Sequence, residues 1–300
     1  MWWLLLSSLV YTVKTPKLDL KITLVETSSL HIHEEIIPQI LEQLIEKIKS
    51  DNVWTDPIIV DEKTMVVLDG MHRVAAAEKL GFKFIPACLV DYDNPSIEVH
   101  VWSRVFRATR RESRAVGVDY LEELLKSLST ASYRSVHVPG LEAGLEMLSR
   151  RDIMGVLVYG RRVVGLKSPT RDIKAIYDRV KGVENIAANR GFTVEYHTEK
   201  DAIALAERAD CVVLIPPVIR KDEVREVVLR GEVFIHKATR HVIPARPLRV
   251  NVPLSWLTGE VSLEKAREEL VKYLSRRSVK VLPPGTVLDR KYEEELYVFE

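Results

Sequence analysis

Cysteine is scarce in this sequence, and its placement bears on the redox environment. The chain contains 2 cysteines, Cys88 and Cys211. Each lies in an apolar run, at residues 86–90 and 211–215. We therefore expect both to be buried strand residues in a reducing compartment rather than partners in a disulfide. No Cys/His spacing resembles a zinc site.

Long hydrophobic runs are also missing. The most apolar stretch, residues 1–10, is too short to span a bilayer. It has no basic residue before the apolar run and no clear small-residue cleavage site, so it is a poor signal peptide. We expect an edge strand or a frayed tail there, no membrane partner, and a cytoplasmic protein.

Charge of one sign is not in excess. The chain carries 44 Lys and Arg against 43 Asp and Glu, for a formal net charge of +1. Dedicated DNA-binding proteins usually have a basic excess or a basic face. Nucleic acid is therefore not an expected partner. Asn and Gln are scarce while Glu, Lys and Arg are abundant, a bias typical of proteins from hot environments.

The length and periodicity of the chain predict a globular mixed α/β protein. Its 300 residues, 46% hydrophobic and 29% charged, suit one large or two modest domains. Residues 107–118, rich in Arg and Ser, resemble a linker. Strands and helices are expected to alternate along the chain. The expected strands are 21–25, 57–60, 65–68, 84–90, 97–102, 191–197 and 211–215, with a hairpin at 156–165. The expected helices are 36–48, 74–80, 120–128, 170–180, 201–208, 221–229 and 263–274.

The usual phosphate-binding and nucleophile motifs are absent. The sequence contains no Walker loop, no GxSxG and no Rossmann glycine set, so any phosphoryl chemistry needs another scaffold. The strongest local signal is Asp69-Gly-Met-His-Arg73 between an expected strand and helix. A helix N-terminus attracts anions, Gly70 allows close backbone approach, and His72 and Arg73 add donors. Asp69 can hold magnesium or orient a hydroxyl. The alternative is a solvated helix start capped by Asp69.

Two further segments are dense in polar side chains. Lys237-Ala-Thr-Arg-His-Val-Ile-Pro244 forms a donor-rich loop that could hold a carboxylate or be a surface turn. His31-Ile-His-Glu-Glu35 places carboxylates at a helix start, where they could act in catalysis or only as caps.

These three segments, in this order, resemble the archaeal free L-serine kinases, which have the ParB/sulfiredoxin fold. The likeness covers roughly residues 20–255. It is carried by His33-Glu34, Asp69-Gly-Met-His-Arg73, Val99-His-Val-Trp102, and Arg230-Gly-Glu-Val followed by residues 237–244. The resemblance implies a ParB/sulfiredoxin-like nucleotide-binding lobe in residues 1–106 and a second α/β lobe in 107–255 that completes the serine site. A C-terminal helical extension then occupies 256–300.

The resemblance also implies an activity, namely Mg²⁺-dependent transfer of a phosphoryl group from ADP or ATP to L-serine, giving O-phospho-L-serine. It makes Glu34 the general base, while Asp69 positions the magnesium and the reacting groups. Gly70, His72 and Arg73 bind the nucleotide phosphates. The pocket for serine consists of Trp102, Thr239, Arg240 and His241. The sequence leaves the identity of the donor and the oligomeric state open.

One departure from the family pattern separates the competing interpretations. This chain has Met71 where the kinases carry a first histidine of a His-His pair. Sulfiredoxins need a reactive cysteine at this point, so thiol chemistry is missing. Chromosome-partition proteins usually have glutamate there and a helix-turn-helix downstream. This sequence has neither feature. The alternative that stays open is a ParB-like nucleotide-binding or DNA-associated module without kinase activity.

Overall fold

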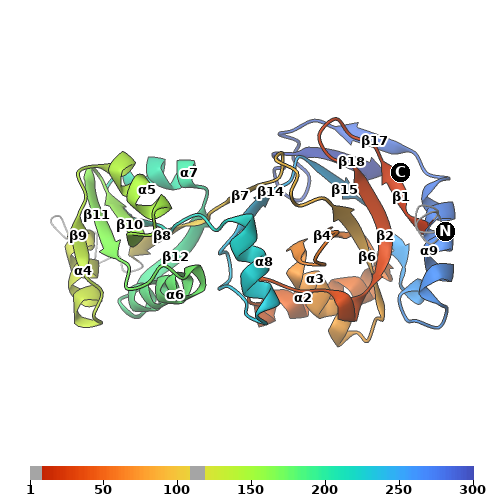
Figure 1. Ribbon diagram of the computed structural model, residues 1–300, viewed down its shortest axis with the longest axis horizontal. Helices are drawn as coiled ribbons and strands as arrows, with labels where there is room; N and C mark the ends of the chain where they lie inside the picture. The colour runs from red at the N-terminus through yellow and green to blue at the C-terminus, as the bar shows by residue number, and fades with distance from the viewer. Residues whose placement is uncertain (1–8, 109–118) are drawn as a thin grey trace. The chain divides into compact units, whose positions relative to one another are not determined.

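The computed structural model describes residues 9–108 and 119–300. The chain divides into two compact units (Figure 1). The first unit contains Met1–Glu98, Val224–Val233 and His241–Glu300, and the second contains Val99–Glu223 and Phe234–Arg240. The chain therefore returns to the first unit twice, whereas the lobes expected from the sequence, 1–106, 107–255 and 256–300, are each continuous. In the part of the chain described, no helix is long and apolar enough to cross a membrane.

The first unit is built on a five-stranded sheet with the order β1-β2-β6-β4-β5. Its β4 and β6 run parallel and the other neighbours are antiparallel. Nearly every residue of β4 and β6 is buried, as expected for strands covered on both faces. The strands are β1 (Tyr11–Val13), β2 (Leu20–Glu26), β4 (Ile58–Asp61), β5 (Val67–Asp69) and β6 (Phe84–Val90).

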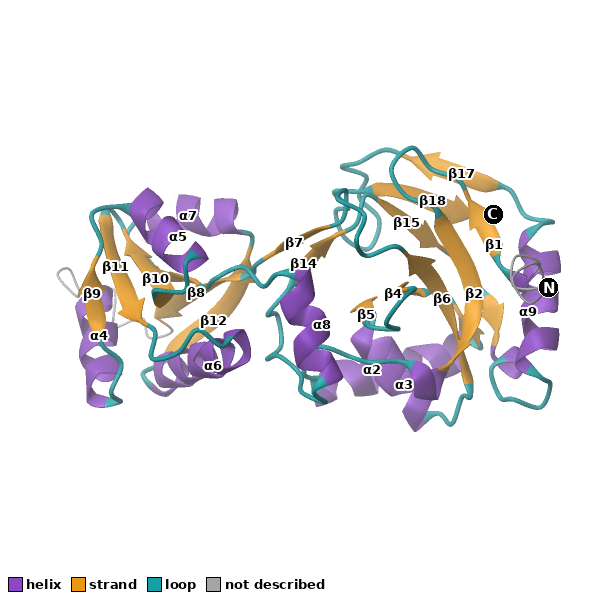
Figure 2. Cartoon of the chain, in the orientation of Figure 1, coloured by secondary structure: helices purple, strands orange, loops and turns teal. Residues whose placement is uncertain are grey.

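Three helices complete the hydrophobic core around this sheet (Figure 2). They are α2 (Pro38–Asp51), α3 (Met71–Lys79) and α9 (Leu263–Leu274). Helices α2 and α3 pack against each other, and α9 packs on β2 and β1. The expected helix at 36–48 begins at Pro38, because proline fits the first helical position, where the backbone N–H would have no partner.

The residues after 240 also belong to the core of the first unit. Two short strands, β16 (Val252–Pro253) and β3 (Val53–Trp54), pair with each other. A further three-stranded sheet has the order β15-β18-β17, made of β15 (Ala245–Leu248), β17 (Val279–Leu282) and β18 (Glu295–Phe299). Buried Val252, Leu270 and Phe299 lie in the same hydrophobic cluster as Ile22. The extension is thus an integral part of this unit.

The second unit is a six-stranded antiparallel sheet with the order β12-β8-β13-β10-β11-β9. Its strands are β8 (Ser103–Ala108), β9 (Ser135–His137), β10 (Ile153–Tyr159), β11 (Arg162–Lys167), β12 (Phe192–His197) and β13 (Val212–Ile215). Its helices are α4 (Tyr120–Thr130), α5 (Leu141–Ser149), α6 (Ile173–Asn189) and α7 (Glu199–Ala206). Strand β8 was not expected from the sequence, and the predicted linker lies almost entirely outside the described residues.

Three short elements lie where the chain passes from one unit to the other. They are β7 (Glu98–His100), α8 (Lys221–Leu229) and β14 (Arg240–Val242), and β7 pairs with β14. The mixed α/β class predicted from the sequence is confirmed. Both cysteines are free and buried, as expected, with Cys88 in β6 and Cys211 directly before β13.

Candidate active site

The turn between β5 and α3 requires a glycine. Gly70 has φ +100° and is the N-cap residue of α3. A Cβ atom there would lie 2.7 Å from Cγ2 of Ile58 and 2.9 Å from Nε of Arg73. Within the described structure no side chain caps the start of α3, so Asp69 is not the cap considered above. The first N–H groups of α3 can therefore receive an anion.

The carboxylate of Asp69 is held by two arginines. Its Oδ2 accepts hydrogen bonds from Nη2 of Arg73 at 2.7 Å and from Nη1 of Arg246 at 2.6 Å. Desolvation acts to raise the pKa of Asp69, but the charges of Arg246 and Arg73 outweigh it and hold the pKa well below its usual range. Asp69 is therefore an ionised carboxylate with a fixed orientation. Arg246, in β15, was missed by the sequence analysis.

The two side chains expected to bind phosphate have partners inside the first unit. Besides Asp69, Arg73 donates through Nη1 to the carbonyls of Asp56 at 3.1 Å and Pro57 at 2.6 Å. The Nε2 atom of His72 accepts a hydrogen bond from the N–H of Ile37 at 3.0 Å. Both residues thus fix the start of α3 relative to the segments around it, and their role toward a nucleotide stays a prediction.

Glu34 is buried and lies beside β5. Its neighbour His33 is fully buried and donates from Nδ1 to the carbonyl of Val67 at 2.6 Å. The His33 Nε2 atom lies 3.9 Å from Oε1 of Glu34. Burial lowers the pKa of His33, although the Glu34 charge acts to raise it. Since β5 ends at Asp69, the segment of Glu34 and the strand of Asp69 are neighbours at one edge of the sheet.

His241 joins this cluster from a distant part of the sequence. Its ring packs edge-on against His33, with centroids 5.2 Å apart, and its Nε2 lies 2.8 Å from the hydroxyl of Tyr92. Tyr92 is fully buried. The only sequence signal for Tyr92 was its position between two aspartates directly after a buried strand.

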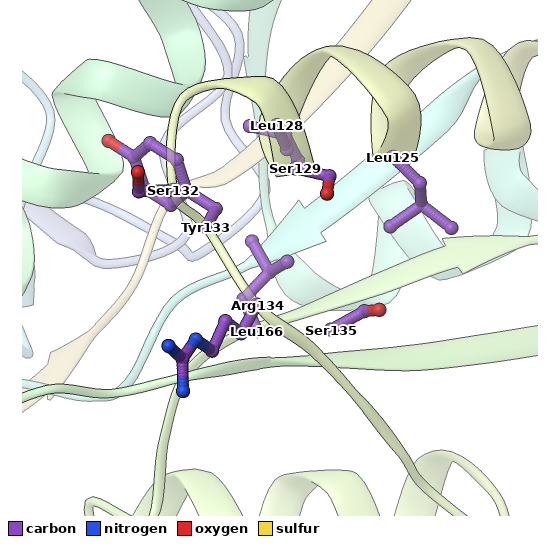
Figure 3. A pocket seen from close by; sticks show the side chains of 8 residues that line it. All are labelled: Leu125, Leu128, Ser129, Ser132, Tyr133, Arg134, Ser135 and Leu166. Carbon is purple, nitrogen blue, oxygen red and sulfur yellow. The ribbon is translucent and has the colours of Figure 1, made fainter.

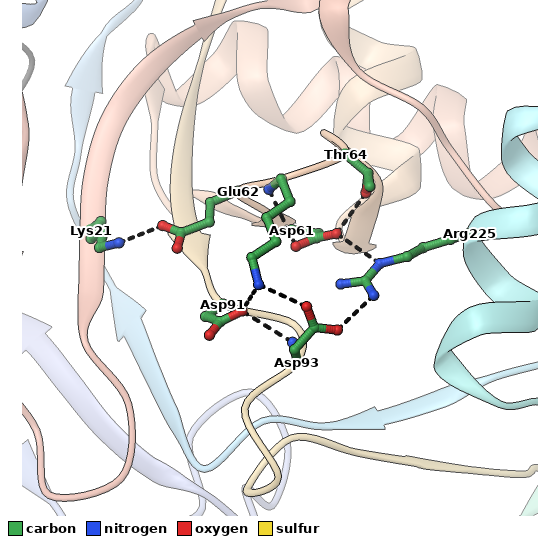
Figure 4. A network of polar contacts seen from close by, with 8 residues as sticks. Lys21, Asp61, Glu62, Thr64, Asp91, Asp93 and Arg225 are labelled. Carbon is green, nitrogen blue, oxygen red and sulfur yellow. Dashed lines mark hydrogen bonds and ion pairs between the residues drawn. The ribbon is translucent and has the colours of Figure 1, made fainter. Parts of the chain in front are cut away.

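A polar network joins Arg225 to Asp61 and Asp93 (Figure 4). The guanidinium of Arg225, in α8, stacks on the Tyr92 ring at 5.0 Å and binds Asp61 at 3.1 Å and Asp93 at 2.6 Å. Hydrogen bonds from Arg225 and Lys63 lower the pKa of Asp93 to about 2. The network thus fixes the Arg225 side chain over the ring that contacts His241.

In the second unit, the structure brings Trp102 together with the donor-rich loop. The ammonium of Lys237 lies 4.6 Å from the centre of the Trp102 ring, and the guanidinium carbon of Arg240 lies 5.8 Å from it. Lys237 has φ +60°, a left-handed conformation that is uncommon outside glycine and concentrates at functional sites. Thr239 is buried. Of the predicted serine pocket, Trp102, Thr239 and Arg240 lie in the second unit and His241 in the first.

Two buried side chains hold these groups in place. Tyr177 donates from its hydroxyl to the carbonyls of Pro217 at 2.8 Å and Ala238 at 3.2 Å. Arg104 is fully buried and donates to the Trp102 carbonyl at 2.6 Å and to a Glu184 carboxylate oxygen at 2.6 Å. The loop after Lys237 and the backbone of Trp102 are therefore anchored to the same unit.

A separate cavity of about 520 Å³ lies between α4, the turn after it, β9 and β11 (Figure 3). The Tyr133 hydroxyl at its wall donates to the carbonyl of Arg179 at 3.0 Å. None of the predicted site residues is among those that line it. The lining residues are Leu125, Leu128, Ser129, Ser132, Tyr133, Arg134, Ser135 and Leu166.

Asp69 fits a magnesium site only if the substrate phosphates supply further ligands. Among the described residues, no group of three or more His, Cys, Asp or Glu side chains could hold a metal ion. Magnesium in kinase sites is usually bound by one or two carboxylates together with substrate phosphates. Asp69, with one oxygen engaged by two arginines, fits such a site and not an all-protein cage.

The chain is similar in sequence to several curated proteins, although no family model matches it. An ATP-dependent L-serine kinase of Staphylothermus marinus is 29% identical over 263 residues, which cover 82% of this chain and 96% of that protein. An ADP-dependent L-serine kinase of Thermococcus kodakarensis is 26% identical over 253 residues, with the same coverage. A ParB-like protein of Sulfolobus acidocaldarius is 26% identical over 239 residues, covering 77% and 96%.

The fold is also similar to that of a known kinase. A free serine kinase in complex with AMP matches with a TM-score of 0.62 and 25% identity, covering 82% of this chain and 97% of that protein. The resemblance predicted from the sequence is therefore confirmed: over 82% of its length, this chain is similar in sequence and in fold to the archaeal free L-serine kinases.

Proposed function

We propose that this protein is a free L-serine kinase that transfers a phosphoryl group from ATP or ADP to the hydroxyl of L-serine, giving O-phospho-L-serine. The observation that carries the proposal is the arrangement at the β5 edge of the sheet. There, buried Glu34 and ionised Asp69 lie on neighbouring segments beside a helix start without a side-chain cap. The similarity to L-serine kinases supports the choice of acceptor.

In the proposed reaction the Glu34 carboxylate accepts the hydroxyl proton of serine as the hydroxyl oxygen attacks the terminal phosphorus. The new O–P bond forms as the bond to the leaving nucleotide breaks, which releases ADP or AMP. The N–H groups at Gly70 and the start of α3 receive the phosphates, with His72 and Arg73 beside them. Phosphoryl transfer depends mainly on such positioning and charge neutralisation.

Asp69 would hold magnesium in this proposal, and the ion would supply further neutralisation of phosphate charge. In this proposal the serine binds to Trp102, Thr239, Arg240 and His241. The cations that face the Trp102 ring, Lys237 and Arg240, suit the carboxylate of an amino acid. We further propose that the protein acts in the cytoplasm, which agrees with its two free, buried cysteines.

The test is direct detection of O-phosphoserine. Purified protein is incubated with Mg²⁺, L-serine and either ATP or ADP, and the product is measured by mass spectrometry. We expect product with at least one donor, and the comparison of the two identifies it. If neither nucleotide gives product and L-serine causes no thermal shift in the presence of nucleotide, the kinase proposal fails. The ParB-like module without kinase activity would then be the better interpretation.

A further inference from the structure

A row of alternating charges runs from the β5–α3 turn to the segment before β18, and it ends at Arg290, whose Nη2 lies 3.6 Å from Oε1 of Glu294. Arg73 and Arg246 both donate to Asp69, and Arg246 also donates from Nε to Oε1 of Glu294 at 2.6 Å. We propose that Arg246 and Glu294 are positioning residues for Asp69, so that the C-terminal extension is a working part of the active site. The expected effect on turnover rests on the proposed function. The coupling of Glu294 to Asp69 through Arg246 rests on the structure alone.

The geometry of Arg246 supports a role as a bridge. Its guanidinium engages one carboxylate through Nη1 and another through Nε, both at 2.6 Å. The side chains of Arg246 and Glu294 are only 10% and 11% exposed. Charge-assisted hydrogen bonds of this length are among the strongest in proteins. Removing one charge from such a shielded row leaves its neighbour uncompensated, so each member depends on the others.

Backbone pairing fixes Glu294 beside Arg246. Strands β15 and β18 run parallel, with Ala245 opposite Glu295, and the N–H of Glu295 donates to the carbonyl of Pro244 at 3.2 Å. At the other end of β18, Arg277 donates to the carbonyl of Phe299 at 2.8 Å. Strand β18, which begins directly after Glu294, is therefore held at both ends, as an element that positions a side chain needs to be.

The effect on Asp69 is orientational. Both arginines donate to the same oxygen, Oδ2, which restricts the rotation of the carboxylate. Arg73 comes from the first turn of α3, and Arg246 is 177 positions away from Asp69 in the sequence. Small displacements of a group that orients reactants lower turnover strongly. Loss of Glu294 should therefore reduce turnover through Arg246 and Asp69.

The test is a double-mutant cycle on serine phosphorylation. Glu294→Gln is expected to lower kcat about tenfold, with the KM for serine changed less than about twofold. In the Asp69→Asn background, the same substitution is expected to lower kcat less than about twofold further, because its route of action is already lost. The matched control is Glu293→Gln, on an exposed neighbouring glutamate, which should leave kcat unchanged. Multiplicative effects of Asp69→Asn and Glu294→Gln would overturn the inference.

The wild type, Asp69→Asn, Glu294→Gln and the double variant are also compared by urea unfolding, which does not depend on activity. We expect the unfolding equilibrium constant of the double variant to differ about tenfold or more from the value that the two single variants predict together. Agreement within about twofold overturns the coupling, even if the protein proves not to be a serine kinase. Absence of O-phosphoserine from the wild-type protein overturns the proposed function instead. If Glu294→Gln does not fold, Arg246→Lys serves the same cycle, since lysine keeps the charge but lacks the fork that reaches two carboxylates.

Discussion

The hydroxyl of Tyr92 lies 2.8 Å from Nε2 of His241, although the two residues are 149 positions apart in the sequence. The Tyr92 ring is fully buried and stacks against the guanidinium of Arg225. When the hydroxyl donates to Nε2, the neutral imidazole of His241 carries its proton on Nδ1. The direction of this hydrogen bond and the tautomer of His241 are therefore coupled.

This relationship predicts a selective effect of Tyr92→Phe. The substitution removes only the hydroxyl and leaves Nε2 of His241 without this partner, so the imidazole loses a constraint on its orientation. We expect the KM for serine to rise about five- to tenfold, while nucleotide affinity measured by calorimetry stays within about twofold. The matched control is Tyr133→Phe, which removes a hydroxyl that bonds to the Arg179 carbonyl in the second unit. An unchanged KM for serine would remove Tyr92 from this role.

The general base is tested by Glu34→Gln. The amide keeps the shape of the side chain but cannot accept the serine proton, so we expect turnover to fall about a hundredfold or more. Nucleotide binding should remain near the wild-type value, because the amide keeps the size of the side chain and the N–H groups at the start of α3 are unchanged. Glu35→Gln is the matched control on the next residue. Turnover near the wild-type value in Glu34→Gln, with loss in Glu35→Gln, would transfer the role to Glu35.

Helices with clear end signals were predicted well from the sequence. Helix α8 matches the expected bounds Lys221–Leu229, and α9 matches Leu263–Leu274, because polar caps and helical spacing are local signals. Strands β8 and β15 were missed. Strand β8 contains Arg104, which reads as exposed although its side chain is fully buried against Glu184. Strand β15 contains Pro247, which argues against a strand interior.

The residues of the candidate site also differ in whether the sequence shows a local signal for them. Asp69, Gly70 and Glu34 could be predicted as site residues because a short segment shows a turn or a helix start by itself. Tyr92 and Arg246 were missed because their role depends on contacts with residues far away in the sequence. A single charged or aromatic residue in an apolar run has no local mark that distinguishes a site residue from a core residue.

Arg73 combines binding and structure, and two substitutions separate these roles. Arg73→Ala removes hydrogen bonds to Asp69, Asp56 and Pro57. We expect it to lower the free energy of unfolding by about 2 kcal/mol or more. It should also weaken nucleotide binding. His72→Ala removes the acceptor of the Ile37 N–H, and we expect it to weaken nucleotide binding as well. Calorimetry that finds nucleotide binding intact in both variants would place the phosphate site elsewhere.

The buried ring of His33 predicts a loss of stability on acidification. In the unfolded chain His33 titrates near the ordinary histidine pKa of about 6.5, whereas burial lowers its pKa in the folded protein. Below pH 6.5 the unfolded chain therefore binds a proton that the folded protein does not, and unfolding becomes more favourable as the pH falls. Above pH 6.5 this contribution to stability is fully present.

The slope of this dependence is measurable by urea unfolding at a series of pH values. One such group changes the free energy of unfolding by at most about 1.4 kcal/mol per pH unit. His33→Gln keeps a donor for the Val67 carbonyl but does not titrate, so we expect the slope between pH 6 and pH 5 to decrease by up to that amount. His31→Gln is the matched control, on an exposed histidine two positions away. A decrease as large in His31→Gln as in His33→Gln would contradict burial of His33 as the cause.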